Sequence, residues 1–486
     1  MKQQSLSQDP TVQFSYLSDK KKSLIYSETL EILQYTGAEI HHEQARSLLR
    51  SQGCTVRDKR VYIPSQLVKR CLQTVPPVTT IHRWDHSGRV RIEPYKSYFG
   101  PGPTCPYFID PYSRERRRYL RRDARHVASV CDVLPEIDFV MSLGSISDVT
   151  DGLEEVYEFS ELIQESSKPI IAWCYDKKHC RLLHEIASAV AGGKENLYHR
   201  PLYFFYNEPL SPLMCDYNAA DKLLYCAQHG IPQIFAPANT GGATVPPTHA
   251  AHLVVTLAES LIGVVLSQIR QPGSCIIIGG TQSILDMRRM IFSYGAPELS
   301  VLSLGLTELA DFLELPVFVA GGCSDAKITD PQSAMESAFS LHSALMSGAN
   351  LVHDVGFLES GMTGSLFQLV LANEVLGMGR RIINGIEVTD NTLALEEIHQ
   401  HSLGGSHYQS DHSTKMAERN WQPRLMERRN YEDWKADGSK SMRDRIRDYT
   451  LDILQNRASR RYELGQDIRN RIQAVLHEAE EGKVQD

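Results

Sequence analysis

Short runs of apolar, β-branched and aromatic residues recur along the chain at intervals of roughly 30–40 residues. Eight such runs occur, at residues 96–100, 137–143, 168–174, 201–207, 231–236, 274–279, 315–320 and 349–353. Between and after them lie helix-like segments, at residues 123–134, 153–166, 179–191, 216–229, 248–269, 297–313, 331–347 and 365–377. Apolar strands that alternate with amphipathic helices predict a parallel sheet covered by helices.

The number of strand–helix units favours a closed barrel over an open sheet. Eight units are enough to close a (β/α)8 TIM barrel. A doubly wound sheet would usually carry a glycine-rich phosphate loop after its first strand, whereas that loop reads GPGPTCP here, and its prolines suit a dinucleotide poorly. We therefore predict an α/β fold, with the barrel at residues 96–380. A mostly helical N-terminal extension is expected at 1–95 and a C-terminal helical region at 381–486, with a helix or helix pair at 441–481.

The composition changes this picture little, but it excludes some function classes. The 486-residue chain is 42% hydrophobic and 23% charged, and its net charge of −8 argues against nucleic-acid binding. Its apolar stretches are broken before the about 18 residues of a membrane span, and the N-terminus lacks the apolar core of a signal peptide. The ten cysteines occur singly, as in proteins of reducing compartments. These features predict a cytoplasmic protein.

Polar and aromatic side chains gather where the predicted strands end. The carboxyl ends of all strands in a barrel meet on one face, and active sites are built there. Residues at or just after these ends are Tyr98, Phe99, Trp173, Tyr206, Glu208, Asn239, Gly279, Gly280, Gly322, Asp325, His353, Phe357 and Glu359. Aromatic faces with nearby carboxylates suit a quaternary ammonium ligand. Glycines at strand ends let a flat, bulky group approach the backbone closely.

Some of these positions are consistent with more than one role. His353 could be a ligand contact, a general base or a hydrogen-bonded buried side chain, and its place at a strand end favours function. Cys323 could be a nucleophile or a small thiol that packs in the core. The histidines and cysteines show no zinc-type pairs, so no metal-binding residue is predicted.

Several motifs agree in order and spacing with those of one known superfamily. They are NEPLSPL at 207–213, NTGGATVPPT at 239–248, SDAKITDPQSAMESA at 324–338, GANLVHDVGFLESGMTGS at 348–365 and GIEVTDNTLALEEI at 385–398, with WQPRL and YEDW further on. With these motifs, residues 20–455 resemble the trimethylamine methyltransferase superfamily. The resemblance implies the same barrel. It also implies transfer of a methyl group from a methylated amine to the Co(I) corrinoid, a cobalamin, of a small partner protein.

The resemblance also narrows the expected substrate. Founding members of the superfamily carry pyrrolysine near the position of Leu358–Gly361, where this chain has ordinary residues. It therefore resembles the non-pyrrolysine branch, which implies a quaternary amine. Glycine betaine is the first choice, and proline betaine, carnitine and γ-butyrobetaine are alternatives. Because a quaternary amine leaves as a neutral tertiary amine, no general acid is needed, and the protein's task is binding and orientation. Competing hypotheses are a zinc-dependent corrinoid methyltransferase and a non-catalytic betaine-binding protein.

This interpretation gives each candidate residue an expected role. We expect substrate contacts from Tyr98, Phe99, Trp173, Tyr206, Glu208 and Phe357, catalytic roles for His353, Glu359 and Asp325, and corrinoid contacts at Asn239, Gly279, Gly280 and Gly322. The corrinoid should be presented by a separate protein, because the chain lacks the DxHxxG signature of a lower axial histidine. No metal is expected on this chain itself. The C-terminal helical region could support a homo-oligomer.

Overall fold

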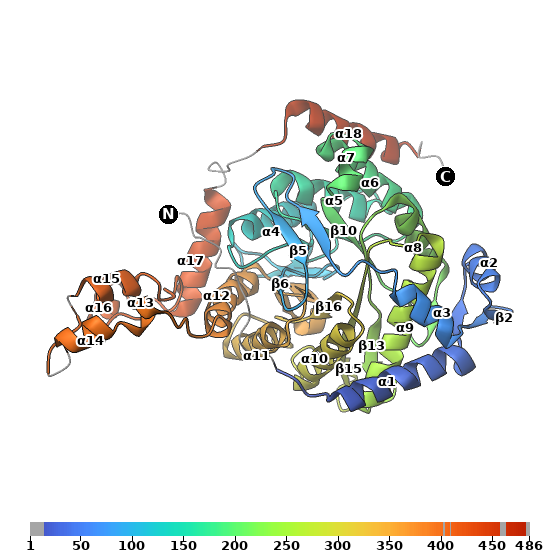
Figure 1. The fold of residues 1–486 in the computed structure, drawn as a ribbon. Helices are drawn as coiled ribbons and strands as arrows, with labels where there is room; N and C mark the ends of the chain where they lie inside the picture. Colours follow the sequence, from blue (N-terminus) through green and yellow to red (C-terminus); the bar gives the residue numbers. More distant parts are fainter. Residues whose placement is uncertain (1–13, 402–403, 409, 457–462, 483–486) are drawn as a thin grey trace.

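Seven parallel strands curl around a common axis in the computed structural model, which describes residues 14–401, 404–408, 410–456 and 463–482 (Figure 1). The strands are β6 (Tyr98–Phe99), β9 (Ile170–Ala172), β10 (Tyr203–Asn207), β12 (Gln233–Phe235), β14 (Ile276–Asp286), β16 (Val317–Ala320) and β17 (Leu351–His353). Hydrogen bonds join them in the order β6-β17-β16-β14-β12-β10-β9.

The eighth position of the ring is occupied by irregular backbone. Val140 forms a parallel bridge with Ile170 of β9, and the Asp138 amide donates to the Phe99 carbonyl of β6 at 2.7 Å. These bonds close the ring, so the predicted (β/α)8 barrel is confirmed. The regular strand expected at 137–143 does not form, because the Asp138 carboxylate accepts the Phe99 amide at 2.9 Å in place of a backbone carbonyl.

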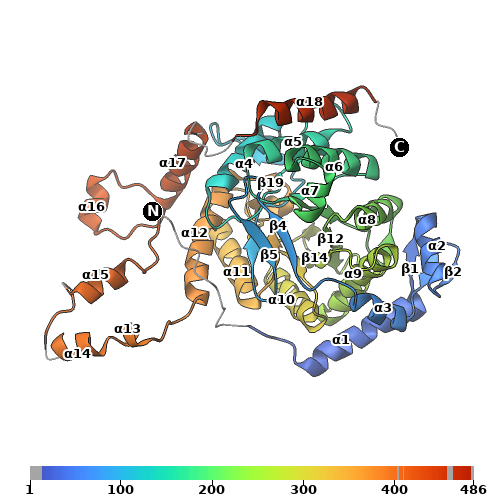
Figure 2. The same cartoon turned by 45° about the horizontal axis from the view of Figure 1, so that its top comes forward.

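The eight predicted outer helices are confirmed and surround the strands (Figure 2). They are α4 (Arg121–Val133), α5 (Glu154–Glu165), α6 (Lys177–Ala191), α8 (Tyr217–His229), α9 (His249–Arg270), α10 (Pro297–Phe312), α11 (Pro331–Ser347) and α12 (Leu366–Ile383), with a short α7 (Lys194–His199) after α6. Only α9, among the described helices, has the length and apolarity of a membrane span. Of its most apolar window, 78% is buried inside the protein, as in a core helix.

The N-terminal extension is built from helices and short strands. It contains α1 (Asp19–Glu31), a π-helical turn (Ile32–Thr36), α2 (Glu43–Ser51) and α3 (Ser65–Leu72). A small sheet joins β1 (Ala38–Ile40), β2 (Thr55–Arg57) and β3 (Arg60–Tyr62) to β11 (Met214–Cys215) of the barrel loops. Both α1 and α3 pack against α9. The extension therefore covers the apolar outer face of that helix.

A β-hairpin, β4 (Thr79–His82) and β5 (Arg89–Ile92), closes the amino end of the barrel. Its residues Ile81, Val90 and Ile92 belong to the same buried cluster as the interior strand residues. The His82 amide donates to the carbonyl of Pro201, just before β10, at 2.8 Å. With the amino end filled, the carboxyl end is left for a site.

Two further β-structures lie at the carboxyl end. Strands β7 (Tyr107–Ile109) and β8 (Arg116–Arg118) form one sheet with β18 (Phe357–Leu358) and β19 (Thr363–Gly364). Strands β13 (Ala238–Gly241) and β15 (Ile291–Phe292) pair with the long β14. These elements follow barrel strands in sequence, so they bring residues from distant loops over the same end of the barrel.

The C-terminal region begins with an arm that extends away from the barrel (Figure 1). The described residues of this arm form four short helices, α13 (Asp390–Leu393), α14 (Leu395–His401), α15 (Asp411–Ala417) and α16 (Tyr431–Ala436). The predicted helix pair follows as α17 (Met442–Gln455), which packs against α4 and α12, and α18 (Gln466–Glu480), which packs against α5 and α6. Both helices therefore lie on the outer helical layer of the barrel.

Candidate active site

Strand side chains alternate between the barrel interior and the helical layer, because the side-chain period of a strand is two residues. The interior cluster contains Phe139, Met141, Ile171, Phe204, Tyr206, Ile234, Ala236, Ile277, Phe318 and Leu351, with Trp173 partly buried against it. Tyr206 lies two residues beyond Phe204 and His353 two beyond Leu351, so both face inward at the carboxyl end. The two rings lie 6.1 Å apart between centroids.

His353 is held in one orientation by its neighbours. Its ring stacks on Phe318 with a centroid separation of 3.9 Å and an interplanar angle of 3°. Nδ1 lies 2.7 Å from Asp354 Oδ1, and Nε2 lies 3.4 Å from the Thr281 hydroxyl. When Asp354 is ionised, Nδ1 of the neutral imidazole carries the proton, which leaves Nε2 as an acceptor beside Thr281.

Tyr206 and Glu208 form a second polar pair at the end of β10. The Tyr206 hydroxyl donates to Glu208 Oε2 at 2.5 Å. Solvent reaches the Glu208 side chain, yet protein surrounds it closely enough that desolvation raises the pKa of its carboxyl. The Tyr206 bond and His353 act against that rise, whereas the charge of Asp354 adds to it. Glu208 is therefore a carboxylate in a wet but enclosed position.

Asp354 is the second carboxylate of the site, and it is only 2% exposed. Its backbone has a left-handed φ of 70°. A Cβ on Gly102 would lie 2.0 Å from Asp354 Oδ1, so only glycine permits this close approach. Asp354 Oδ2 is buried and accepts no hydrogen bond of normal geometry from a described residue. Burial, followed by the charge of Asp354, raises the pKa of the Tyr294 hydroxyl well above its ordinary value.

Aromatic rings surround these carboxylates. Tyr294 and Phe357 meet edge to face, with centroids 6.2 Å apart. Phe357 is 3% exposed and would touch any side chain placed at Gly102, whereas Trp173 of the β9 loop is half-buried. Rings from separate strand ends and one hairpin thus converge with two acidic groups, which is an arrangement that attracts cations.

Asp325 and Glu359 support the site from its edge. Asp325 accepts the Tyr294 amide and the Ser360 hydroxyl, each at 2.8 Å, and therefore positions the tyrosine. Glu359 pairs with the Arg116 guanidinium at 2.7 Å and accepts the Thr363 hydroxyl at 2.5 Å. Burial acts to raise the pKa of Glu359, but these two partners hold it below the ordinary value. Both carboxylates already accept hydrogen bonds from neighbouring groups, which supports positioning roles, and the catalytic roles expected for them stay predictions.

Tyr98 and Phe99 do not lie with the other aromatic residues, contrary to expectation. The Tyr98 hydroxyl donates to the Arg91 carbonyl of the closing hairpin at 3.0 Å, which places this side chain at the amino end. Phe99 is fully buried in the helical layer, with the Arg380 guanidinium of α12 5.7 Å from its ring centre. The physical reason is that β6 is two residues long, so one side chain faces inward near its start and the next faces outward.

The residues expected to contact the corrinoid pack closely against other parts of the protein. The Asn239 amide donates to the Ser211 hydroxyl and to Glu259 Oε2, each at 2.9 Å, and its oxygen accepts the Thr256 hydroxyl. Side chains at the three glycines would collide with neighbouring protein atoms: at Gly279 with Phe318 and Ala236, at Gly280 with Thr256, and at Gly322 with Leu341. Internal packing therefore occupies the side-chain space at these four positions, and the corrinoid contacts expected there stay a prediction.

Sequence reasoning assigned no role to three residues that complete the site. Asp354 directly follows His353 at the end of a predicted strand, which is a signal in the sequence, but the acidic roles were predicted for Asp325 and Glu359. Tyr294 follows β15 in a segment without a periodic hydrophobic pattern, so the sequence gives no signal for it. The role of Gly102 is seen only in the structure, from its close approach to Asp354. Cys323 is fully buried, and burial raises its pKa well above the ordinary value, which favours a packing thiol over a nucleophile.

Comparison with known proteins agrees with the motifs. The family model described as trimethylamine methyltransferase (MTTB) matches residues 2–481. The chain belongs to the trimethylamine methyltransferase family.

Relatives of this family member include enzymes named for different amines. It is 31% identical over 444 residues to the trimethylamine methyltransferase MttB of Desulfitobacterium hafniense strain DSM 10664 / DCB-2, covering 90% of this chain and 89% of that one. It is 30% identical to MttB of Methanosarcina thermophila, with 92% and 94% covered. It is 28% identical to the glycine betaine methyltransferase of D. hafniense strain Y51, with 87% and 88% covered. The chain is therefore a methyltransferase of this family.

Proposed function

We propose that this methyltransferase takes a methyl group from a quaternary amine, with glycine betaine as the first choice, and passes it to the Co(I) corrinoid of a separate partner protein. The observation that carries the proposal is the convergence of Glu208 and Asp354 with the rings of Tyr206, Tyr294 and Phe357 at the carboxyl end of the barrel. A quaternary nitrogen cannot donate hydrogen bonds, so ring faces and nearby negative charge are the means of binding it.

The charge balance of the site supports a ligand that brings its own positive charge. The negative charge of Asp354 contributes to the raised pKa of the Glu208 carboxyl. The two carboxylates therefore repel one another in the free protein. Lys222 is buried and donates to the Cys174 carbonyl at 2.7 Å, and its influence on the pKa of Glu208 is smaller than that of Asp354. A bound cation would relieve this repulsion, whereas a neutral amine would not.

The segment Leu358–Gly361, where the resemblance puts pyrrolysine in founding members, has a structural role in this chain. Glu359, Ser360 and Gly361 all have positive φ values, of 53°, 54° and 83°. The Ser360 hydroxyl bonds to Asp325, and Gly361 approaches the Tyr294 ring so closely that a Cβ would lie 2.8 Å from it. The segment thus supports Tyr294, and no electrophilic side chain is present on it. This favours a substrate that is already activated by a permanent charge.

The protein's own contribution is then binding and orientation. The corrinoid supplies a strong nucleophile, and the leaving group is a neutral tertiary amine, so no proton has to be delivered. Glu208, Asp354 and the surrounding rings would hold the ammonium group in one place. His353, fixed between Phe318, Asp354 and Thr281, would position the rest of the substrate. The same ammonium group is common to proline betaine, carnitine and γ-butyrobetaine, which remain alternative substrates.

A substrate panel tests the proposal. Purified protein is mixed with cob(I)alamin and each of glycine betaine, proline betaine, carnitine, γ-butyrobetaine and trimethylamine, and cobalt methylation is followed by its absorbance change. We expect turnover with at least one quaternary amine and none with trimethylamine. Turnover with trimethylamine alone would refute the assignment of substrate class. Binding of a betaine without any turnover, also when a corrinoid protein replaces the free cofactor, would refute the proposed reaction.

A further inference from the structure

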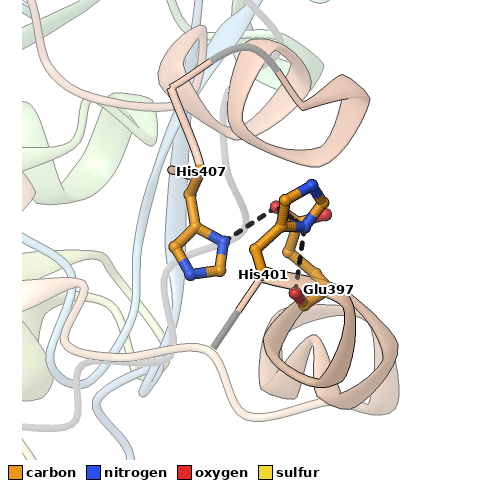
Figure 3. Close-up of side chains that lie close together, drawn as sticks. All are labelled: Glu397, His401 and His407. Atoms are coloured by element: carbon orange, nitrogen blue, oxygen red, sulfur yellow. Dashed lines mark hydrogen bonds and ion pairs between the residues drawn. The ribbon is translucent and has the colours of Figure 1, made fainter. Parts of the chain in front are cut away.

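Three potential metal ligands meet in the C-terminal arm, outside the barrel. Glu397 and His401 lie on α14, and His407 lies beyond the end of that helix (Figure 3). Their ligand atoms all lie within 4.8 Å of one another. Figure 3 shows His407 bonded to the Glu397 carboxylate, whereas Nδ1 of His401 bonds to the backbone carbonyl of Glu397 at 3.3 Å. The Glu397 carboxylate lies only slightly farther from His401 Nδ1 than that carbonyl does, so a small rotation of the ring would bring Nδ1 to the carboxylate.

The distances within this cluster match those around a tetrahedral metal ion. Glu397 Oε1 lies 2.9 Å from His407 Nδ1 and 3.5 Å from His401 Nδ1. Metal–ligand bonds of about 2.0–2.2 Å at tetrahedral angles put neighbouring ligand atoms about 3.3–3.6 Å apart. The 3.5 Å separation lies within that range and the 2.9 Å separation lies below it, so small side-chain rotations would suffice to form the site.

The sequence spacing suits the same geometry. Glu397 and His401 are one helical turn apart, which places both on one face of α14. Five residues separate His401 from His407, at the upper limit of the spacing usual for paired histidine ligands. Glu397 is the least exposed ligand, with 14% of its side chain accessible, whereas His407 is 46% exposed and accessible to an ion from solvent. Two imidazoles and one carboxylate form a donor set that Zn²⁺ favours.

We propose that Glu397, His401 and His407 bind one divalent transition-metal ion of the Zn²⁺ class, with water as the fourth ligand. This differs from the expectation that the chain binds no metal. Figures 1 and 2 both show the arm away from the barrel strands. The ion would therefore stabilise the arm and take no part in methyl transfer. Short helices such as α14 gain little from their own hydrogen bonds, and a metal that links the helix to the following segment would fix it.

The arm buries little apolar surface of its own, so a bound metal would add to its stability. Apolar side chains on it are strongly exposed, including Ile386 at 87%, Leu395 at 61% and Tyr408 at 84%. An element with so little buried apolar surface of its own has little to hold its shape. Metal ligation supplies that constraint without a hydrophobic core.

Zinc titration of the full-length protein tests the site. Protein treated with a chelator and dialysed is titrated with Zn²⁺ by calorimetry, and Co²⁺ is bound in parallel to record its visible absorption bands. We expect one equivalent of Zn²⁺, and Co²⁺ bands of tetrahedral intensity. His407→Ala and Glu397→Gln should each weaken Zn²⁺ binding by about 100-fold or more. The matched control is His399→Ala, an exposed histidine on the same helix, which should bind Zn²⁺ like the parent.

The outcomes separate a built site from adventitious binding. Equal loss of affinity in His399→Ala and His407→Ala, or less than one equivalent in the parent protein, would overturn the proposal. A second measurement guards against misfolding of a variant: in the parent protein, Zn²⁺ should slow proteolytic cleavage within residues 384–440, and chelator should reverse this. A cleavage rate that Zn²⁺ leaves unchanged would also overturn the proposed metal site. None of these measurements involves methyl transfer, so failure of this proposal is distinct from failure of the proposed function.

Discussion

Replacing Glu208 by glutamine removes one negative charge from the site and keeps the shape of the side chain. The methyl groups of a quaternary amine keep its nitrogen about 4–5 Å from a carboxylate oxygen. Glu208 is wet but enclosed, so an effective dielectric constant of about 40, between surface and bulk values, is appropriate. Coulomb's law then gives about 2 kcal/mol, which corresponds to about a 30-fold rise in KM.

The assay is cob(I)alamin methylation with the preferred betaine, measured for the parent, Glu208→Gln and Glu185→Gln. Glu185 is an exposed residue of α6 in the outer layer, so its variant should behave like the parent. A carbon isostere of glycine betaine, 3,3-dimethylbutanoate, serves as a competitive inhibitor without the positive charge. Its inhibition constant should not rise in Glu208→Gln. An unchanged KM for the betaine would refute the electrostatic reasoning, and an equal rise for the isostere would show that Glu208 acts through shape.

The pKa of Glu208 gives the same residue a signature in the pH dependence. Desolvation raises this pKa above the ordinary 4.5, and only the ionised form attracts the substrate cation. As the pH falls through the raised pKa, kcat/KM of the parent should therefore decline, and the Glu208→Gln variant should lack this acidic limb. An acidic limb of the same midpoint in the variant would assign it to another group.

Three further substitutions test the surroundings of the site and the core. Gly102→Ala should lower the free energy of unfolding by about 1–3 kcal/mol through overpacking, and should lower kcat/KM at least about tenfold by displacing Asp354. In the control Gly88→Ala, the new methyl group meets only a flexible arginine, so both stability and kcat/KM should stay unchanged. Glu158 is buried and its pKa is raised by burial to about 8, so stability from its protonated form is complete below pH 4.5 and is lost as the pH rises to 8. Between pH 4.5 and 8, the free energy of unfolding of Glu158→Gln relative to that of the parent should therefore rise by up to about 1.4 kcal/mol per pH unit, as measured by urea unfolding. A difference that does not change with pH would contradict this. Asn239→Ala should lower the free energy of unfolding by about 1–3 kcal/mol without changing the KM for cob(I)alamin, and the reverse pattern would support its cofactor role.

Much of the barrel could be predicted from the sequence because its signals are local. Apolar runs and amphipathic segments each report the burial of their own element, and all eight outer helices lie where the pattern put them. The same reasoning placed His353, Tyr206 and Glu208 together, because residues at the carboxyl ends of parallel strands must meet on one face. It was less successful where a side chain replaced a backbone partner, as Asp138 does in the eighth position of the ring.

Only the tertiary structure decided which way the side chains point and which charges are already paired. In a strand as short as β6, a shift of one residue exchanges inside and outside, so Tyr98 and Phe99 could not be placed by pattern. Whether a carboxylate is available depends on its partners in the folded chain. Glu359 is paired with Arg116, whereas Asp354 uses Oδ1 for His353 and keeps a buried Oδ2 without a hydrogen bond of normal geometry from a described residue. The sequence by itself therefore determined the architecture and the end of the barrel that carries the site. The choice of acidic groups came from long-range contacts, which have no local signal.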